Sequence, residues 1–182
     1  MREYRIVFGR FFFSALIFCL VLPAAVRAQD ETLAQIKYKE DYDRIQKIAA
    51  ITQPVKRADL LIKFYAEKPD LDPKLRVYCD NLFAKDLETL MKQDNSIALK
   101  GLCERALKVR PKFGEAYFFQ GVVFRKEKNL EKAVNCFAKA YLIGNPLQKK
   151  AKELLDTTYR IYNKGSMIGQ DKILRQASQE LK

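Results

Sequence analysis

The sequence predicts an all-α fold of about eight helices arranged as antiparallel pairs. Three observations support this fold class: the breaks are regularly spaced, the apolar residues recur every three or four positions, and two stretches resemble each other at a shift of 34 residues. The segments between breaks are about 12 to 22 residues long, which suits helices, and no strand-like alternation competes. The breaks fall at Pro54, 69–73, 94–95, Pro111, 128–129, 144–146 and 165–166.

The first 28 residues have the three parts of a secretory signal peptide. Three arginines in the first ten residues precede an apolar run over 11–22, which is too short to span a bilayer, because a transmembrane helix needs about 20 residues. Small residues in 24–28 then favour a cut after Ala28. We therefore expect a secreted or periplasmic protein after cleavage near Ala28, with an uncleaved signal anchor as the alternative.

Residues 29–182 are expected to form a single helical-repeat domain. Its first part, 29–72, is predicted to be a divergent N-terminal helix pair, because the 34-residue similarity does not extend back into it. Residues 73–145 hold the two similar repeats, and 146–182 are predicted to be a C-terminal capping helix pair. Short connections between the helices favour antiparallel neighbours.

Local signals mark where several of these helices start and stop. The sequence Asp72-Pro73 predicts a capped helix start with proline at the first helical position. Asn95 or Ser96 can cap the next helix, and Ser166 can cap the last one. Gly165 suits the left-handed residue that closes the helix before it.

The two repeats in 73–145 align apolar residue on apolar residue. The aligned pairs are Phe83 with Tyr117, Leu90 with Phe124, Leu99 with Ala133, Cys103 with Phe137, Ala106 with Ala140, and Leu107 with Tyr141. Large residues begin each first helix, and the aligned alanines lie where the two helices of a pair must approach closely. Such a period is the mark of stacked helix pairs.

Segment 116–140 resembles the tetratricopeptide repeat (TPR). The key packing positions of that family hold Gly121, Ala133, Phe137 and Ala140. The usual Trp and Leu are replaced by Tyr117 and Gln120. The resemblance implies a right-handed superhelical stack, a TPR-like α-solenoid, in which peptides bind a concave groove lined by first helices. An irregular helical bundle is the alternative, and Gly121 is expected to tolerate no added bulk.

The resemblance also implies which residues line the groove. Carried over position by position, they are Lys85, Lys92, Phe118, Val122, Arg125, Lys126, Lys152 and Arg160, together with Asn81, Ala84, Glu88, Glu115, Phe119 and Lys149. The cations among them lead us to expect an acidic protein or peptide ligand with an apolar anchor. The alternative for Phe118, Phe119 and Val122 is that they pack against neighbouring helix pairs.

The composition argues against catalysis. The chain has no His, which removes the commonest general base and metal ligand, and no glycine-rich loop that could cradle a phosphate. After the signal peptide, Cys79, Cys103 and Cys136 remain, with no CxxC spacing. We read them as free, buried apolar residues, and we expect neither a cofactor nor a metal.

The net charge of +12 raises nucleic acid as a partner. Export argues against nucleic acid, and the basic residues recur along every helix among acidic ones rather than forming one block. We therefore expect a non-catalytic exported scaffold that binds a protein or peptide. The alternative is an envelope-associated structural protein whose basic surface holds it to an anionic membrane lipid or a cell-wall polymer.

The first prediction concerns processing. Exported protein should begin at Gln29, because the small residues before it match what signal peptidase accepts. N-terminal sequencing of the exported material checks this. A start at Met1 would contradict the cleavage and would remove the reason for expecting no nucleic-acid partner.

Overall fold

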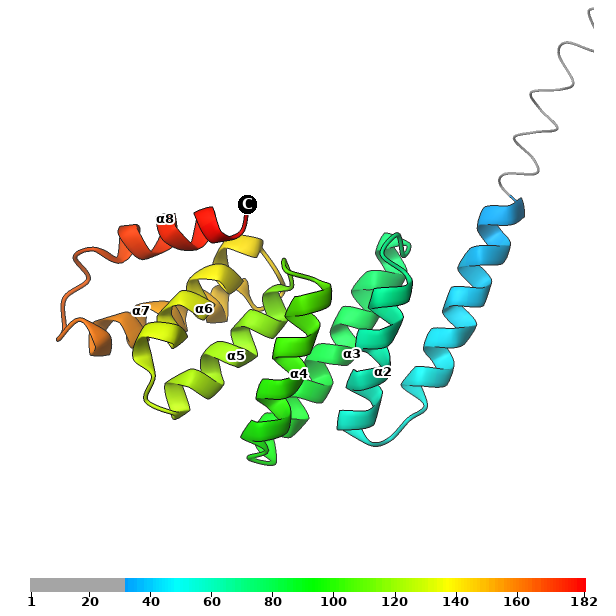
Figure 1. The fold of residues 1–182 in the computed structure, drawn as a ribbon, viewed down its shortest axis with the longest axis horizontal. Coiled ribbons are helices and arrows are strands. Elements are labelled where there is room, and N and C mark those ends of the chain that lie inside the picture. Colours follow the sequence, from blue (N-terminus) through cyan, green and yellow to red (C-terminus); the bar gives the residue numbers. More distant parts are fainter. Residues whose placement is uncertain (1–31) are drawn as a thin grey trace, which may run out of the picture. The chain divides into compact units, whose positions relative to one another are not determined.

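The computed structural model of this protein describes residues 32–182 and divides into two compact units, Met1–Arg44 and Ile45–Lys182 (Figure 1). Of the first unit, residues 32–44 are described and are helical, and this helix continues to residue 49. The second unit then holds α2 (Pro54–Glu67), α3 (Pro73–Lys92), α4 (Ser96–Val109), α5 (Gly114–Lys126), α6 (Leu130–Ile143), α7 (Gln148–Tyr162) and α8 (Gln170–Glu180).

The predicted all-α fold is confirmed for the described residues, which form eight helices and no strand. None of these helices combines the length and the apolar character needed to cross a membrane. The predicted signal peptide, 1–28, and its cleavage site lie outside the described residues.

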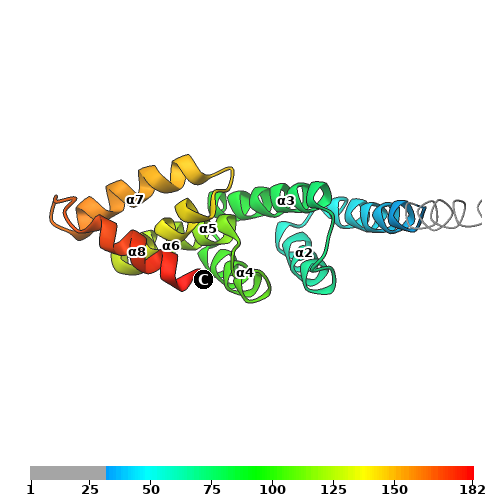
Figure 2. The same ribbon diagram turned by 90° about the horizontal axis from the view of Figure 1, so that it is seen from above.

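The helices of the second unit pack mainly against their neighbours in the chain. From α2 to α7 each helix contacts the next one, and contacts also join α2 with α4, α3 with α5, α5 with α7, and α6 with α8. No two labelled helices further apart in sequence make a substantial contact. Figure 2 shows the result: α3 and α7 lie along one side of this unit, and α2, α4 and α8 lie along the other. Contacts limited to near neighbours are typical of stacked helical repeats.

Most of the predicted helix ends are confirmed. Asp72 Oδ1 accepts a hydrogen bond from Lys74 N at 2.8 Å, and Asn95 Oδ1 accepts one from Ala98 N at 3.2 Å. Gly165 has a φ of +93° and donates its N–H to Arg160 O, which closes α7 as expected. The expectation for Ser166 is wrong: α8 begins only at Gln170, so Ser166 Oγ instead accepts the N–H of Ile168 inside the preceding turn.

A close contact between α5 and α6 lies at Gly121. The ring of Phe137 on α6 packs directly over Gly121 on α5, where an added Cβ would lie 2.7 Å from Phe137 Cε1. Ala133 and Ala140 on the same face of α6 are fully buried. These small residues let the two helix backbones approach closely, which is what their positions in the repeat predict.

A polar cluster joins α2, α3 and the start of α5. Asp80 accepts hydrogen bonds from Tyr65 Oη at 2.6 Å and from Arg110 Nη2 at 3.1 Å. The guanidinium of Arg110 also lies over the rings of Tyr65 and Phe113, at 4.6 and 4.2 Å from their centroids. Because the charge of Arg110 is both paired and stacked on aromatic rings, it can be held at a helix junction where an isolated charge would be costly.

The C-terminal helices depart from a simple antiparallel pair. α7 packs on α6, and α8 also packs mainly on α6, where Glu180 forms an ion pair with Lys139 at 2.6 Å. α7 and α8 are joined near their connecting turn, where Gln170 Nε2 donates to Asp156 Oδ1 at 2.9 Å. The end of the stack is therefore covered by α8 lying along α6.

The glycine contact predicts opposite effects for two matched substitutions. Gly101→Ala should raise the free energy of unfolding by about 0.5–1 kcal/mol, because Gly101 lies inside α4 with no atom near the new methyl group. Gly121→Ala gains the same helix propensity, but its methyl group collides with the buried Phe137 ring. Its free energy of unfolding should therefore fall by about 1–3 kcal/mol overall. Urea unfolding measures both changes, and equal stabilisation by the two variants would contradict the packing of α5 on α6.

The cysteines generate a second test. Cys79, Cys103 and Cys136 are free and buried, as predicted, and burial raises the pKa of Cys79 and of Cys136 to about 12. Because the thiolate is the reactive form, all three should react slowly with iodoacetamide in the native protein at pH 8. A chain lacking residues 1–28 and unfolded without reductant should expose three thiols, whereas a count of one would reveal a disulfide.

Candidate functional site

A groove of about 500 Å³ runs across α3, α5 and the start of α7. It is lined by Asn81, Ala84, Lys85, Glu88, Met91, Phe118, Phe119, Val122, Arg125, Leu147, Lys150 and Leu154. Its two walls and its floor come from three different helices, so its shape depends on how they stack. A concave site with a largely apolar surface and a few polar groups is the usual form of a binding site.

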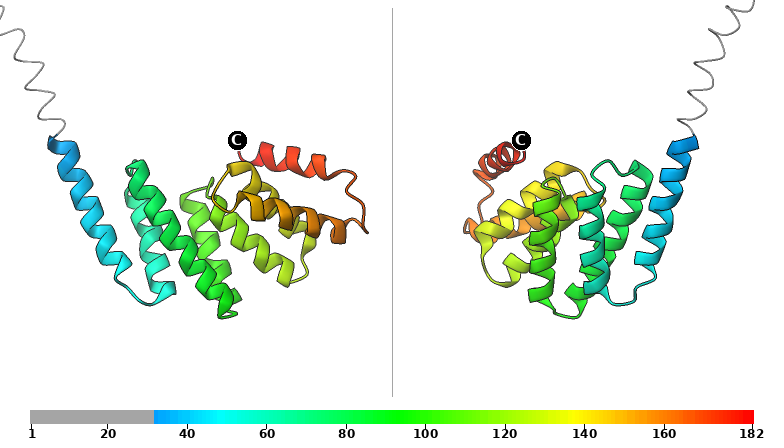
Figure 3. Two further views of the ribbon diagram at one scale, coloured as in Figure 1. Left: turned by 180° about the vertical axis from the view of Figure 1, so that it is seen from behind. Right: turned by 45° about the vertical axis from the view of Figure 1, so that its right-hand side comes forward.

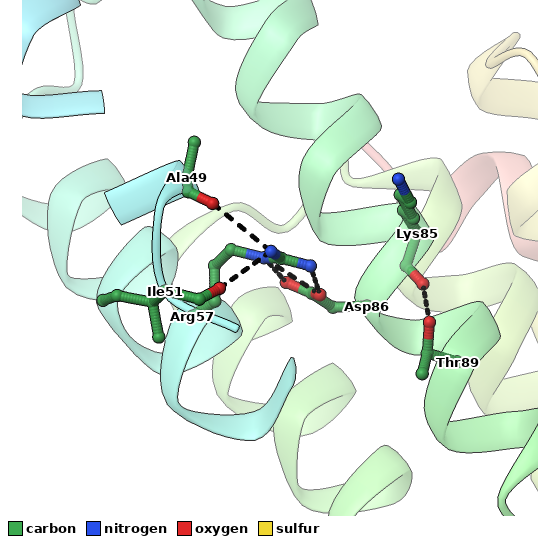
Figure 4. Close-up of polar contacts among 6 residues, drawn as sticks. All are labelled: Ala49, Ile51, Arg57, Lys85, Asp86 and Thr89. Atoms are coloured by element: carbon green, nitrogen blue, oxygen red, sulfur yellow. Dashed lines mark hydrogen bonds and ion pairs between the residues drawn. The ribbon is translucent and has the colours of Figure 1, made fainter. Parts of the chain in front are cut away.

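The first wall is α3, whose rotation is fixed by a buried ion pair. The fully buried carboxylate of Asp86 accepts hydrogen bonds from Arg57 Nε at 3.1 and 3.0 Å, and Arg57 Nη1 donates to Ile51 O at 2.8 Å (Figure 4). Burial raises the pKa of Asp86, and the hydrogen bonds from Arg57 oppose that rise. With Asp86 directed inward, Lys85 and Glu88 lie on the exposed side of α3, where they border the groove.

The floor of the groove is α5, which is buried on most of its surface. Phe118 and Phe119 are only 6% and 3% exposed, and their rings pack edge to face with centroids 5.2 Å apart. The centroid of the Phe118 ring also lies 6.1 Å from the centroid of the Phe137 ring. These two aromatic residues are therefore core residues that reach the groove only at their edges, while Val122 is more open and offers a contact surface.

The second wall is the start of α7. Leu147, Lys150 and Leu154 follow one another at helical spacing on the side that faces α5. The opposite side of α7 is occupied: Lys152 Nζ bonds Asp156 Oδ1 at 2.6 Å and lies 6.0 Å from the centroid of the Tyr141 ring.

The charged residues of the groove give it an excess of positive charge. Lys85, Arg125 and Lys150 take part in no ion pair among the described residues. The one acid, Glu88, is paired with Lys92 at 3.0 Å, and Lys92 is the main cause of its lowered pKa. Three cations outside any described ion pair, around an apolar floor, match a ligand that carries negative charge beside an apolar group.

The groove lining includes some of the predicted residues of α3 and α5 and none of those predicted on α7. Of the eight principal residues, the structure brings Lys85, Phe118, Val122 and Arg125 into the groove. Lys92 and Lys126 lie outside its lining: Lys92 pairs with Glu88, and Lys126 pairs with Asp94.

The other two principal residues, Lys152 and Arg160, lie outside the lining because α7 presents a different face. Its buried residues Ala151, Leu155 and Tyr159 pack on the core, which leaves Lys150 and Leu154 towards the groove. Of the secondary residues, Asn81, Ala84, Glu88 and Phe119 line it, whereas Glu115 is buried and Lys149 lies outside. Sequence reasoning missed Met91, Leu147, Lys150 and Leu154, and the apolar period of α7 was the signal that could have found the last three.

Among residues 32–182, no group of three or more His, Cys, Asp or Glu side chains is placed to hold a metal ion. No protein-family model, curated protein or solved structure matches this chain.

Proposed function

We propose that this protein is a non-catalytic, TPR-like scaffold that is exported from the cytoplasm and binds an acidic protein or peptide segment in its groove. One observation carries the proposal: the groove combines an apolar surface with three cations that have no ion-pair partner. A peptide with a large apolar side chain next to Asp or Glu residues satisfies both features at once.

The two features would have different roles in binding. Apolar contacts with Val122, Met91 and Leu154 would supply most of the affinity, because burying one large apolar side chain contributes about 1.5–3 kcal/mol. The cations Arg125 and Lys150 would speed encounter and set the orientation of the peptide. Binding should accordingly weaken with added salt without disappearing.

The TPR-like part of the proposal is supported by packing. Gly121, Phe137 and Ala140 make the close helix contact that the repeat requires, and contacts in the second unit join near neighbours in the chain. The proposed location, secreted or periplasmic, is supported by the composition of residues 1–28.

The binding test starts from peptides selected with the purified chain from a random display library. Selected sequences should combine an apolar residue with acidic neighbours. Arg125→Glu should then weaken the best peptide at least about tenfold, because it replaces an attraction by a repulsion at the groove, and Val122→Asp should weaken it similarly by removing apolar contact. Isothermal calorimetry gives the dissociation constants.

The matched control is Lys108→Glu, an exposed lysine of α4 that takes part in no described ion pair and does not line the groove. Lys139 is less suitable, because it pairs with Glu180 and holds α8 on α6. If Lys108→Glu and Arg125→Glu weaken peptide binding equally, the whole basic surface binds diffusely. Diffuse binding is the mechanism of the envelope-associated alternative.

A further inference from the structure

We propose that the turn between α7 and α8 inserts into the surface of an anionic lipid bilayer. Three large apolar side chains flank or belong to this turn and form what we call the apolar tip: Ile161, Tyr162 and Ile168, which are 59%, 44% and 86% exposed. Figures 1 and 3 place the turn at the end of the second unit that lies farthest from α2. None of the three residues lines the groove, so this inference does not depend on the proposed function.

The backbone at the tip is already hydrogen-bonded within the protein. The N–H of Ile168 donates to Ser166 Oγ at 3.1 Å, and its C=O accepts from Tyr159 Oη at 2.8 Å and from Asn163 Nδ2 at 3.1 Å. Backbone groups without partners are costly to transfer out of water, whereas satisfied ones are not. The most exposed residue of the tip can therefore enter an apolar phase without leaving its own N–H and C=O groups unpaired, and it is held in place before it binds.

Four cations lie near the apolar tip, three of them in sequence and one in the fold. Arg160, Lys164 and Lys172 belong to the turn or its flanking helices, and Lys128 lines a shallow pocket with Tyr162. None of these four takes part in an ion pair among the described residues.

The acids near the tip do not cancel this charge. Asp171 is paired with Arg175, and Glu127 is paired with Lys100. Asp156 also interacts with Arg160 but is paired with Lys152, and Glu131 remains beside Tyr162. The local charge is therefore positive. Lipid phosphates and carboxylates attract such cations while neighbouring apolar side chains enter the acyl boundary.

The size of the tip favours a membrane over a second copy of the chain. A stable protein interface buries about 800 Å² on each partner, and three side chains at a turn offer much less, since even a large aromatic residue buries only about 150–250 Å². A bilayer needs no matching surface, and a few apolar side chains supported by cations suffice for reversible attachment.

The absence of tryptophan from the chain allows a direct test. Ile168→Trp places one tryptophan at the tip, and Ile97→Trp places one at an equally exposed isoleucine (90%) at the start of α4. With vesicles of phosphatidylglycerol, the fluorescence of the first variant should shift to shorter wavelength and be quenched by brominated acyl chains. The second variant should show neither effect, and vesicles of phosphatidylcholine alone should have little effect on either.

A second variant tests the charges without altering the tip. Adding Arg160→Glu and Lys164→Glu to Ile168→Trp should raise the lipid concentration for half-maximal shift about tenfold or more, because each surface cation contributes several-fold to binding of anionic lipid. The proposal is overturned if the Ile168→Trp signal ignores the lipid, if Ile97→Trp responds equally, or if the charge reversals have no effect. A shift that grows with protein concentration without lipid would instead identify self-association.

Discussion

The close approach of α5 to α6 constrains the rest of the second unit. α5 is apolar on nearly all sides and contacts α3, α4, α6 and α7, and its distance from α6 is set by Gly121 under the ring of Phe137. A larger residue at position 121 would displace α5, and α5 carries the floor of the groove. The small residues that resemble a repeat motif therefore determine the geometry of the groove as well as the stability of one helix pair.

Two kinds of ionic interaction have different consequences in this molecule. Arg57 with Asp86 and Arg110 with Asp80 join helices at buried or half-buried junctions, where removing one partner would leave an uncompensated charge and cost about 3–5 kcal/mol. The cations at the groove and at the apolar tip have no such partner. Exposed cations of this kind contribute little to folding, so substituting them tests binding without unfolding the chain.

Much of the architecture could be predicted from the sequence because it depends on local signals and on one internal period. Asp72 and Asn95 cap helices as expected, and Lys85, Phe118 and Arg125 line the groove because α3 and α5 follow the repeat. The residues predicted on α7, Lys152 and Arg160, lie outside the groove lining, because a helix at the end of a stack packs on one side only and the repeat spacing does not specify its rotation. The exposure of Ile168 depends on hydrogen bonds between residues up to nine positions apart, which no local pattern reveals.

α7 links the two candidate surfaces. Its first turns, with Lys150 and Leu154, border the groove, and its last residues, Ile161 and Tyr162, belong to the apolar tip. A helix rises about 1.5 Å per residue, so the fourteen positions from Leu147 to Ile161 correspond to about 20 Å. A peptide in the groove would thus lie within about 20 Å of any bilayer that holds the tip. That distance exceeds twice the Debye length of about 8 Å in physiological salt, so the charge of an anionic membrane is largely screened there. The tip could therefore hold the protein on a bilayer without repelling an acidic peptide from the groove.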